Sequence, residues 1–312
     1  MGIEELQSRF GITGVLRFEL DEHGMERAMI ETPAAEAIVY LQGAHITHYQ
    51  PAGQKPVLFL SSKSHFAPGK AIRGGIPIIY PWFGAKQDDP KALMHGYART
   101  SAWQVDFGRV NSDVVELGLT LDSPGHSNVR LLVQIGSQLD LELQVSSRSE
   151  GPITIEEAFH SYLAIADVRH SFVVGLGGRT FIDKTDQMQR KMEPQPLLAF
   201  KSETDRVYLN TERACDVFDL YGKRRITIAK SNSASTVVWN PWEEKSRGMF
   251  DMGAGDWQRM LCIETANAAD NAITLAPGAT HRMSASIRAE TFDLVAVLED
   301  LQQEKMQQRR AG

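Results

Sequence analysis

Short segments in which apolar and polar residues alternate are the feature that most limits what this chain can fold into. Residues 113–121, DVVELGLTL, and residues 138–147, QLDLELQVSS, alternate almost without interruption. A period of two residues is that of a β-strand with one buried and one solvated face. The apolar positions that would share a face are Val115, Leu117, Leu119 and Leu121 in the first segment and Leu139, Leu141, Leu143 and Val145 in the second. Both segments are therefore predicted to be half-solvated antiparallel strands.

Similar strand-like runs follow one another along most of the chain, separated by turn-forming residues. They lie at residues 153–166, 225–229, 235–240, 260–264, 271–275 and 283–289. No amphipathic helix lies between them, so the connections that join parallel strands are missing. The sequence therefore predicts an all-β fold, a large antiparallel β-sandwich.

Helical spacing of apolar residues is confined to the two ends of the chain. It covers residues 3–10, which Gly11 follows, and about residues 292–308, so we expect a short N-terminal and a C-terminal helix. A length of 312 residues allows two average domains or one large β domain. Because no internal repeat or low-complexity linker is present, we expect a single domain over residues 1–312 with its core at about 12–290.

Charge and composition narrow the class of partner. The 33 Lys and Arg residues against 39 Asp and Glu give a net charge of -6, which argues against nucleic acid or an anionic membrane as the main partner. The chain has no stretch of 18 apolar residues and no signal-like start. Cys215 and Cys262 have no metal-type spacing and are expected to be reduced thiols. We expect a cytoplasmic monomer that binds a small molecule.

Residues 64–100 are dense in Gly, Pro and aromatic residues and are predicted to form a long functional loop system. Arg73 precedes Gly74 and Gly75, and Arg99 lies near the other end of this segment. Most arginines only solvate a surface. Glycines beside an arginine, however, let backbone and guanidinium approach an oxyanion together, as recognition of a phosphate requires.

Glu264 ends a hydrophobic run, WQRMLCIETAN, at residues 257–267. The run is predicted to be a strand buried on both faces, with Met260 and Cys262 sharing the face of Glu264. The carboxylate has two explanations. It pairs with a nearby charge such as Arg259, or partial burial raises its pKa toward neutrality and makes it a general base.

Two histidines are candidates with equally ordinary explanations. His160 lies on a strand, where a hydrogen-bonded core histidine is the common case, and His95 lies beside a glycine in a loop. Aromatic residues suited to the C–H faces of a sugar ring crowd the same regions. They are Tyr80, Trp82, Phe83, Tyr97, Trp239, Trp242 and Trp257. No phosphate-binding loop, nucleophile elbow or metal-ligand cluster is present in the sequence.

Seven motifs in order resemble those of one enzyme family. They are AIRGGIPIIYPWFG, HGYARTSAW, EEAFHSYLAI, TFIDK, SETDRVY, VVWNPW and DWQRMLCIETAN. Together, from about residue 30 to residue 288, they resemble the hexose-6-phosphate mutarotases, also called glucose-6-phosphate 1-epimerases, of the aldose 1-epimerase superfamily. The resemblance implies a galactose mutarotase-like β-sandwich and the interconversion of α and β anomers of hexose 6-phosphates, glucose 6-phosphate foremost, with neither metal nor organic cofactor.

The resemblance also implies roles for individual residues. It makes Glu264 the general base and His160 the general acid of sugar-ring opening. Other matched positions would bind the substrate, namely Arg73 and Arg99 at the sugar phosphate and His95 and Asp205 along the sugar. Tyr97 stands where many relatives have Phe.

Two rival functions remain at this point. A glycoside-cleaving enzyme on a similar sandwich would need a second carboxylate beside Glu264, for which Glu156 and Glu157 are the candidates. A non-catalytic phosphosugar-binding protein would keep the site and turn nothing over.

Overall fold

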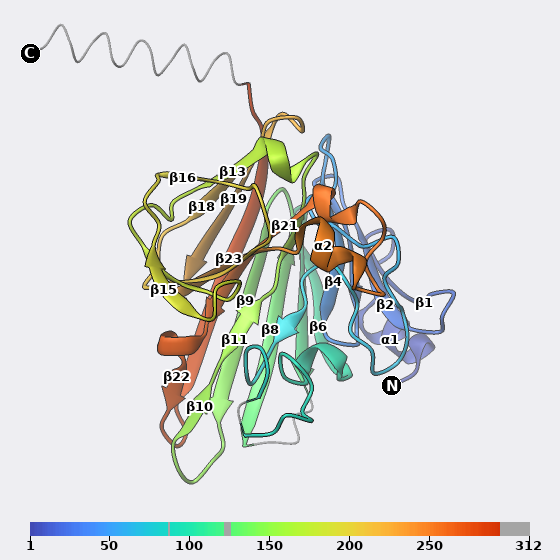
Figure 1. Ribbon diagram of the computed structural model, residues 1–312. Helices are drawn as coiled ribbons and strands as arrows, with labels where there is room; N and C mark the ends of the chain where they lie inside the picture. Colours follow the sequence, from blue (N-terminus) through green and yellow to red (C-terminus); the bar gives the residue numbers. More distant parts are fainter. Residues whose placement is uncertain (87, 122–125, 294–312) are drawn as a thin grey trace, which may run out of the picture.

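Antiparallel β-sheets make up most of the molecule in a computed structural model that describes residues 1–86, 88–121 and 126–293. Two large sheets pack against each other and two small ones flank them (Figure 1). The predicted antiparallel β-sandwich is therefore confirmed. Within the described ranges, no helix is long and apolar enough to cross a membrane.

Helices are few and short. Helix α1 (Ile3–Phe10) lies where the sequence predicted it and buries Leu6. Helix α2 (Trp242–Arg247) was not predicted. The helix expected at about 292–308 lies, from residue 294 on, outside the described residues. Four short 3-10 helices complete the set in the described part of the chain, namely η1 (Ala98–Thr100), η2 (Val168–His170), η3 (Asp256–Arg259) and η4 (Ala269–Asn271).

The first large sheet has nine strands and contains the two segments that alternate most regularly. Its order is β16 (Leu197–Ala199), β13 (Ser171–Val174), β18 (Cys215–Asp219), β19 (Arg224–Ser231), β23 (Thr280–Thr291), β9 (Leu139–Ser147), β8 (Ser127–Ile135), β7 (Val114–Leu121) and β6 (Trp103–Asn111). Leu117 and Leu141, for example, are buried, whereas their neighbours Glu116 and Glu142 are half-buried. The predicted alternation of faces is confirmed.

The second large sheet has eight strands. Its order is β15 (Gln189–Met192), β14 (Thr180–Asp183), β17 (Thr204–Leu209), β20 (Ser235–Asn240), β21 (Met260–Asn267), β11 (Glu157–Phe159) and β5 (Ile78–Ile79), with β12 (Tyr162–Ala164) also paired to β21. Strand β21 is central, and all eight of its residues are buried, as the sequence predicted.

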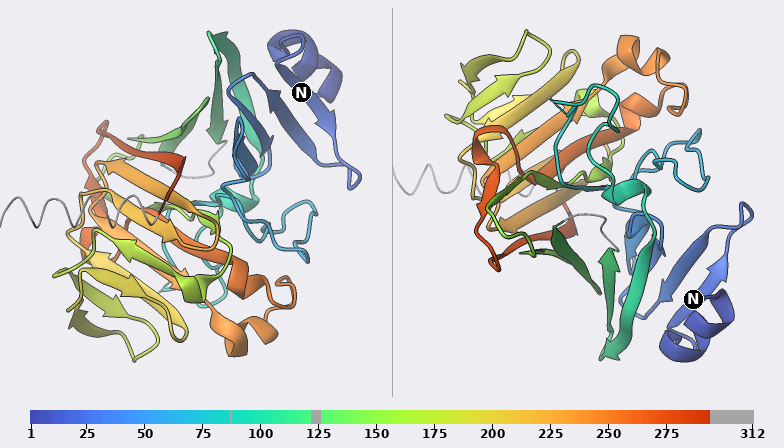
Figure 2. Two further views of the ribbon diagram at one scale, coloured as in Figure 1. Left: turned by 90° about the horizontal axis from the view of Figure 1, so that it is seen from above. Right: turned by 90° about the horizontal axis from the view of Figure 1, so that it is seen from below.

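Two smaller sheets flank this pair. One contains β1 (Leu16–Leu20), β2 (Glu26–Glu31), β3 (Ala35–Tyr40) and β4 (His45–Pro51), and the other contains β10 (Ile153–Ile155) and β22 (Ile273–Leu275). Figure 2 shows α1 and the first strands to one side of the main sheets. That residues 1–312 form one domain remains a prediction.

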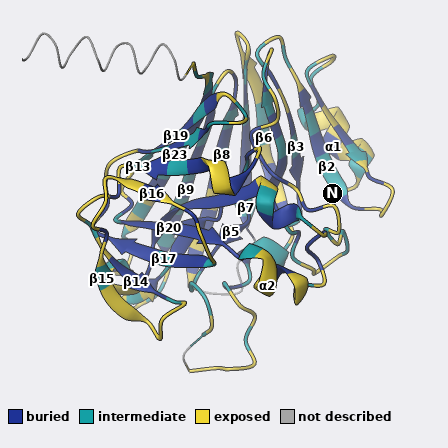
Figure 3. Ribbon diagram, turned by 45° about the horizontal axis from the view of Figure 1, so that its top comes forward, coloured by how far each residue is buried: buried dark blue, intermediate teal, exposed yellow. Residues whose placement is uncertain are grey.

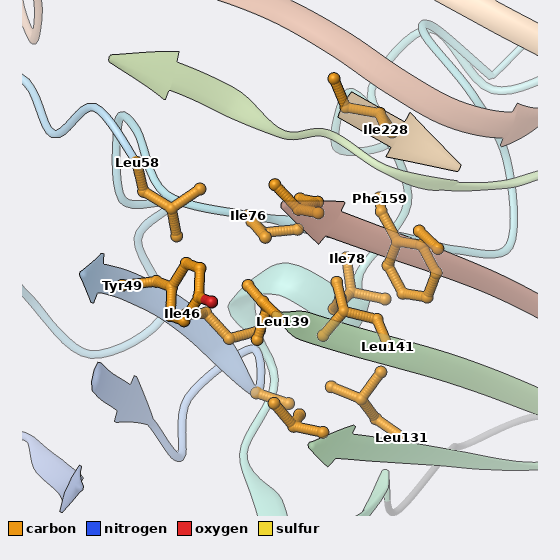
Figure 4. Packing of buried hydrophobic residues seen from close by; sticks show 14 of the residues in the cluster. Ile46, Tyr49, Leu58, Ile76, Ile78, Leu131, Leu139, Leu141, Phe159 and Ile228 are labelled. Atoms are coloured by element: carbon orange, nitrogen blue, oxygen red, sulfur yellow. The ribbon is translucent and has the colours of Figure 1, made fainter. Parts of the chain in front are cut away.

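The main core lies between the two large sheets. Leu131 and Leu141 of the nine-stranded sheet and Phe159 and Ile78 of the eight-stranded sheet belong to one buried cluster (Figure 4). Truncating such a side chain to Ala costs about 2–5 kcal/mol. Figure 3 shows α2 as partly exposed.

The outer face of the eight-stranded sheet is also largely buried, because loops cover it. Two separate apolar clusters lie on this face. One includes Ile182, Val207 and Ala266, and the other includes Cys262 and Trp239. The polar residues between these two clusters form the candidate site.

Candidate active site

Strand β21 places Glu264 in the gap between the two outer apolar clusters. Cys262, two residues before it, belongs to one cluster, and Ala266, two residues after it, belongs to the other. Its antiparallel partner is Val237 on β20. Because side chains alternate along a strand, Glu264 points away from the main core while Ile263 points into it. The Glu264 residue is 1% exposed.

His160 faces Glu264 from the short connection between β11 and β12. Its Nε2 lies 3.3 Å from Oε1 of Glu264, and its backbone N–H donates to the carbonyl of Pro77. The imidazole stacks on the ring of Tyr162, with centroids 4.7 Å apart, and the ring of Trp239 meets it edge-on at 6.0 Å. Packing on two sides therefore fixes the ring beside the carboxyl group.

Three buried polar atoms of this region have no hydrogen-bond partner among the described residues. They are Oε2 of Glu264, Nδ1 of His160 and Nε of Arg99. Buried polar atoms are normally paired, because an unpaired one costs about 1–3 kcal/mol. Their concentration beside a His–Glu pair is the pattern of a site that bonds a ligand.

Burial controls the protonation of the pair. It raises the pKa of Glu264 well above its usual range, a shift that nearby Lys184 opposes. Burial also lowers the pKa of His160 well below its usual range, and His95 and Arg99 act in the same direction. Both shifts favour the uncharged forms, because charge is costly to desolvate. The neutral pair and the ion pair nevertheless contain the same number of protons. They differ only in whether one proton lies on Glu264 or on His160.

Arg73 approaches from the loop before β5. Its Nη1 donates to the hydroxyl of Tyr162 at 2.9 Å, and its Nε and Nη2 lie 3.1 and 3.0 Å from one Asp251 oxygen. Both following glycines are required, because an added Cβ would lie 2.5 Å from the Phe59 carbonyl oxygen at Gly74 and 2.2 Å from the Ile46 carbonyl oxygen at Gly75. The glycines thus let this loop pack against neighbouring backbone and hold the guanidinium in place.

Arg99 supplies a second guanidinium from η1. Its Nη2 donates to the carbonyl of Met94 at 2.8 Å. Burial lowers the pKa of Arg99, and the positive charge of Arg73 acts in the same direction. The repulsion between two buried guanidinium groups is offset when an anion binds between them, so the arrangement favours anion binding.

His95 adopts a left-handed conformation, with φ of 65°. Its Nδ1 accepts a hydrogen bond from the N–H of Gly84 at 3.2 Å, so Nε2 carries the proton. Burial, together with Arg99 and Lys184, lowers the pKa of His95 to about 3. The ring meets His160 edge-on at 5.8 Å, which makes it a neutral hydrogen-bond donor beside the pair.

Asp205 lies on β17, opposite Trp239 of β20. Its Oδ2 is 3.3 Å from Nζ of Lys184. Burial raises the pKa of Asp205, and Lys184 opposes that shift. The structure therefore gathers all six predicted site residues around one part of the outer face.

Lys184, Tyr162 and Asp251 contact the candidate site residues and were not named by sequence reasoning. Lys184 ends the motif TFIDK, directly after strand β14, and a cation at a strand end beside the other motifs was the available signal. Tyr162 follows His160 by two residues, and its ring stacks on the imidazole. His160 itself lies between two strands, and not on a strand as the sequence had predicted. Asp251 has no sequence signal that distinguishes it from a surface carboxylate.

The two carboxylates proposed as partners for Glu264 in a glycoside-cleaving enzyme are engaged elsewhere. The carboxylate of Glu156 accepts hydrogen bonds from the backbone N–H groups of Phe83 and Ala269, each at 2.8 Å. Glu157 is fully buried and accepts from Asn267 at 2.9 Å. Neither carboxylate has an interaction with Glu264 comparable to that of His160.

Comparison with known proteins agrees with this site and fold. The family described as Aldose 1-epimerase matches residues 27–288, and the chain belongs to that family of isomerases. A protein of Escherichia coli K12 named "Putative glucose-6-phosphate 1-epimerase" is 32% identical over 264 residues, which cover 81% of this chain and 86% of that protein. A protein of the same name from Cenchrus ciliaris is 32% identical over 259 residues, 78% of each chain.

A solved structure extends the similarity. The crystal structure of a "putative mutarotase (YeaD)" from Salmonella typhimurium has a TM-score of 0.84 and 27% identity to this chain. The alignment covers 93% of this chain and 99% of that one. The family predicted from the seven motifs is confirmed.

Proposed function

We propose that this protein interconverts the α and β anomers of hexose 6-phosphates, with glucose 6-phosphate as its main substrate. The observation that carries the proposal is the buried contact of 3.3 Å between His160 and Glu264, with two arginines beside it. The relatives that carry the name glucose-6-phosphate 1-epimerase support the choice of substrate.

Ring opening requires one proton acceptor and one proton donor close to C1, which carries both the hydroxyl and the ring oxygen. Glu264 takes the proton of the C1 hydroxyl while His160 gives a proton to the ring oxygen, so that the ring opens to the free aldehyde. Rotation about the C1–C2 bond then presents the other face of the carbonyl. Closure reverses both transfers, and the protein returns to its starting state.

The reactive charges form inside the pair. Because burial favours neutral Glu264 and neutral His160, moving one proton between Oε1 and Nε2 creates the carboxylate and the imidazolium without any exchange with solvent. The positive charge of Lys184, which lowers the pKa of Glu264, favours the carboxylate. Arg99 lowers the pKa of both groups, so it favours the carboxylate and opposes the imidazolium. The arrangement supplies an acid and a base at one pH from a single shared proton.

Substrate binding is assigned to the surrounding groups. Arg73 and Arg99 bind the phosphate and hold the opened chain while C1 rotates, because binding energy away from the reacting carbon keeps that carbon in place. His95 donates from Nε2 to a sugar hydroxyl, and Asp205 accepts from another. Lys184 orients Asp205 through their contact of 3.3 Å.

The proposal includes a cytoplasmic monomer that needs neither metal nor organic cofactor. Cys215 and Cys262 are buried free thiols, as expected in a reducing compartment. The net charge of -6 supports a small-molecule substrate rather than nucleic acid.

Magnetisation-exchange NMR between the α and β anomeric protons tests the proposal. Glucose 6-phosphate and glucose are measured in parallel, each with and without the protein. We expect acceleration that strongly favours the phosphorylated sugar. Tight binding of glucose 6-phosphate without faster exchange would instead identify a phosphosugar-binding protein.

A further inference from the structure

The hydroxyl of Tyr162 accepts a hydrogen bond but has no acceptor for its own proton among the described residues. Tyr162 follows His160 by two residues and is 2% exposed. Nη1 of Arg73 donates to the hydroxyl oxygen at 2.9 Å. Because arginine has no acceptor atom, this contact leaves the phenolic O–H unused. Tyr162 therefore has a free donor beside the guanidinium of Arg73.

Two other buried tyrosines that accept from an arginine do use their proton. The Tyr208 hydroxyl accepts from Nη1 of Arg206 at 3.3 Å and donates to Oε2 of Glu193 at 2.8 Å. The Tyr40 hydroxyl likewise accepts from an arginine at 3.4 Å and donates to Oδ2 of Asp21 at 2.9 Å. In both cases a carboxylate completes the bonding of the hydroxyl. The tyrosine at the candidate site lacks this carboxylate among the described residues.

A carboxylate does contact the same arginine, but from another side. One oxygen of Asp251 lies 3.1 Å from Nε and 3.0 Å from Nη2 of Arg73, whereas Tyr162 bonds Nη1. Asp251 thus fixes the guanidinium without accepting the tyrosine proton. Burial raises the pKa of Tyr162, a shift that the charge of Arg73 opposes, so the hydroxyl keeps its proton at neutral pH.

The position of this donor is fixed by contacts on every part of Tyr162. Its backbone N–H donates to the carbonyl of Gly75 and its carbonyl accepts from the N–H of Phe59, both at 2.9 Å. Its ring stacks on that of His160, with an interplanar angle of 8°, and meets the ring of Trp239 edge-on at 5.9 Å. The donor is therefore held in place before a ligand arrives.

The surroundings of the donor define the chemistry of its acceptor. A buried donor without a partner is unfavourable, so the site favours a ligand that supplies an acceptor. The adjacent guanidinium favours a negatively charged one. A phosphate has several acceptor oxygens, so it can bond the guanidinium of Arg73 and the hydroxyl of Tyr162 at the same time.

We propose that Tyr162 is a substrate-binding residue whose hydroxyl donates a hydrogen bond to the phosphate of the hexose 6-phosphate, beside Arg73. This inference rests on the proposed function, which assigns Arg73 to the phosphate. Because the same ring stacks on His160, Tyr162 then contacts both the phosphate and the proposed general acid.

Tyr162→Phe tests the bond, because it removes the hydroxyl and keeps the ring. We expect KM for glucose 6-phosphate to rise about tenfold with kcat within about threefold, since a bond to the unreacting phosphate is lost equally in the ground state and the transition state. Phosphorus NMR titration should show about tenfold weaker binding of inorganic phosphate. Unchanged phosphate affinity in this variant would overturn the assignment.

Tyr208→Phe is the matched control, because it also removes a buried hydroxyl that accepts from an arginine. Its KM for glucose 6-phosphate and its affinity for inorganic phosphate should stay within about twofold of the wild-type values. A loss in Tyr208→Phe as large as that in Tyr162→Phe would show a general effect of losing a buried hydroxyl and would also overturn the assignment.

A double-mutant cycle separates a direct bond from an effect exerted through Arg73. If Tyr162 only positions the guanidinium, Tyr162→Phe should cost nothing more once Arg73→Ala is present. The direct bond predicts a further rise in KM for glucose 6-phosphate of at least about threefold in the double variant. No further rise would overturn the bond to phosphate.

The failure of the proposed function is distinguishable from the failure of this assignment. If the unmodified protein binds inorganic phosphate but does not accelerate exchange of glucose 6-phosphate, the proposed function fails, and the phosphate titration alone decides the role of Tyr162. If exchange is present and Tyr162→Phe changes neither KM nor phosphate affinity, the assignment fails and the proposed function stands. Absence of phosphate binding by the unmodified protein would overturn the assignment as well.

Discussion

Two His–Glu pairs, each with a buried glutamate, lie on opposite faces of the eight-stranded sheet, and only one has the surroundings of a catalyst. His281 of β23 and Glu157 of β11 are 2.8 Å apart and join the two large sheets. Asn267 of β21 donates to the same oxygen of Glu157. His160 and Glu264 are 3.3 Å apart on the outer face, where Glu264 has no such additional donor among the described residues.

The difference shows that burial beside a histidine does not by itself make a carboxylate catalytic. The inner pair bridges two sheets through short contacts, so it stabilises their packing. The outer pair lies among Arg73, Arg99 and Lys184, with unpaired polar atoms on both His160 and Glu264, whereas in the inner pair only Oε2 of Glu157 is a buried polar atom without a partner among the described residues. These surroundings leave it able to bond a substrate. Equivalent substitutions in the two pairs should therefore separate turnover from stability.

The largest effect is expected from replacing the histidines. His160→Gln removes the proposed general acid, and exchange of glucose 6-phosphate should fall about a thousandfold. His281→Gln is the matched control and should keep turnover within about threefold, since it lies outside the proposed catalytic groups. Magnetisation-exchange NMR measures both variants. Comparable losses in the two folded variants would remove the distinction between the pairs.

Arg73→Ala should separate binding of the phosphate from catalysis. We expect kcat/KM for glucose 6-phosphate to fall about a hundredfold and that for glucose to change only a few-fold, because the lost interaction is made to the phosphate. Arg190→Ala removes an exposed ion pair with Asp270 and serves as the control. Equal losses on the two sugars would contradict the phosphate assignment.

Lys184→Met should change the pH profile of the reaction. The cation lowers the pKa of Glu264, so its loss raises that pKa further and leaves less carboxylate at neutral pH. The acidic limb of kcat/KM should move to higher pH, with about a tenfold loss at pH 7. Lys184→Arg keeps the charge and should restore the limb. A loss of activity with an unmoved limb would show that Lys184 acts only as a structural support.

Replacing each of the two glutamates by Gln should change the stability of the protein in opposite directions at pH 8. Glu157→Gln weakens the contact between the sheets and should lower the free energy of unfolding by about 1–3 kcal/mol. Burial raises the folded-state pKa of Glu264, so the wild type loses stability as pH rises above the unfolded value of about 4.3. Glu264→Gln avoids that loss. It should be at least as stable as the wild type at pH 8, an advantage that disappears near pH 4.

Urea unfolding at the two pH values tests this contrast. A fall in stability for Glu264→Gln at pH 8 as large as that for Glu157→Gln would mean that both pairs are mainly structural.

Much of the fold was predictable because it follows from a local pattern. The alternation at residues 113–121 and 138–147 identifies β7 and β9, and the uninterrupted apolar run identifies the doubly buried strand β21. Helix α2 was not predictable in this way. Its six residues, WEEKSR, have no apolar period, and its start depends on the Asn240 side chain, which accepts from the N–H of Trp242.

The proximity of the candidate site residues was predictable from the motifs, but their electrostatics were not. The motifs named His160 and Glu264. Lys184 ends one of the motifs but was identified by its contact with Asp205, and Asp251 is recognised only through its contact with Arg73. The resemblance implied that Glu264 is the base and His160 the acid, but it did not indicate the charge of the resting pair. The structure favours the neutral forms, because the burial of both residues depends on loops distant in sequence.

We assign the chemistry to the outer His–Glu pair and not to the inner one, and the glutamates of the two pairs provide the test. Magnetisation exchange of glucose 6-phosphate is recorded for Glu264→Gln and Glu157→Gln under conditions where both variants are folded. We predict a loss of about a thousandfold for Glu264→Gln and a change within about threefold for Glu157→Gln. Retention of more than about a tenth of the wild-type rate by Glu264→Gln would contradict the claim.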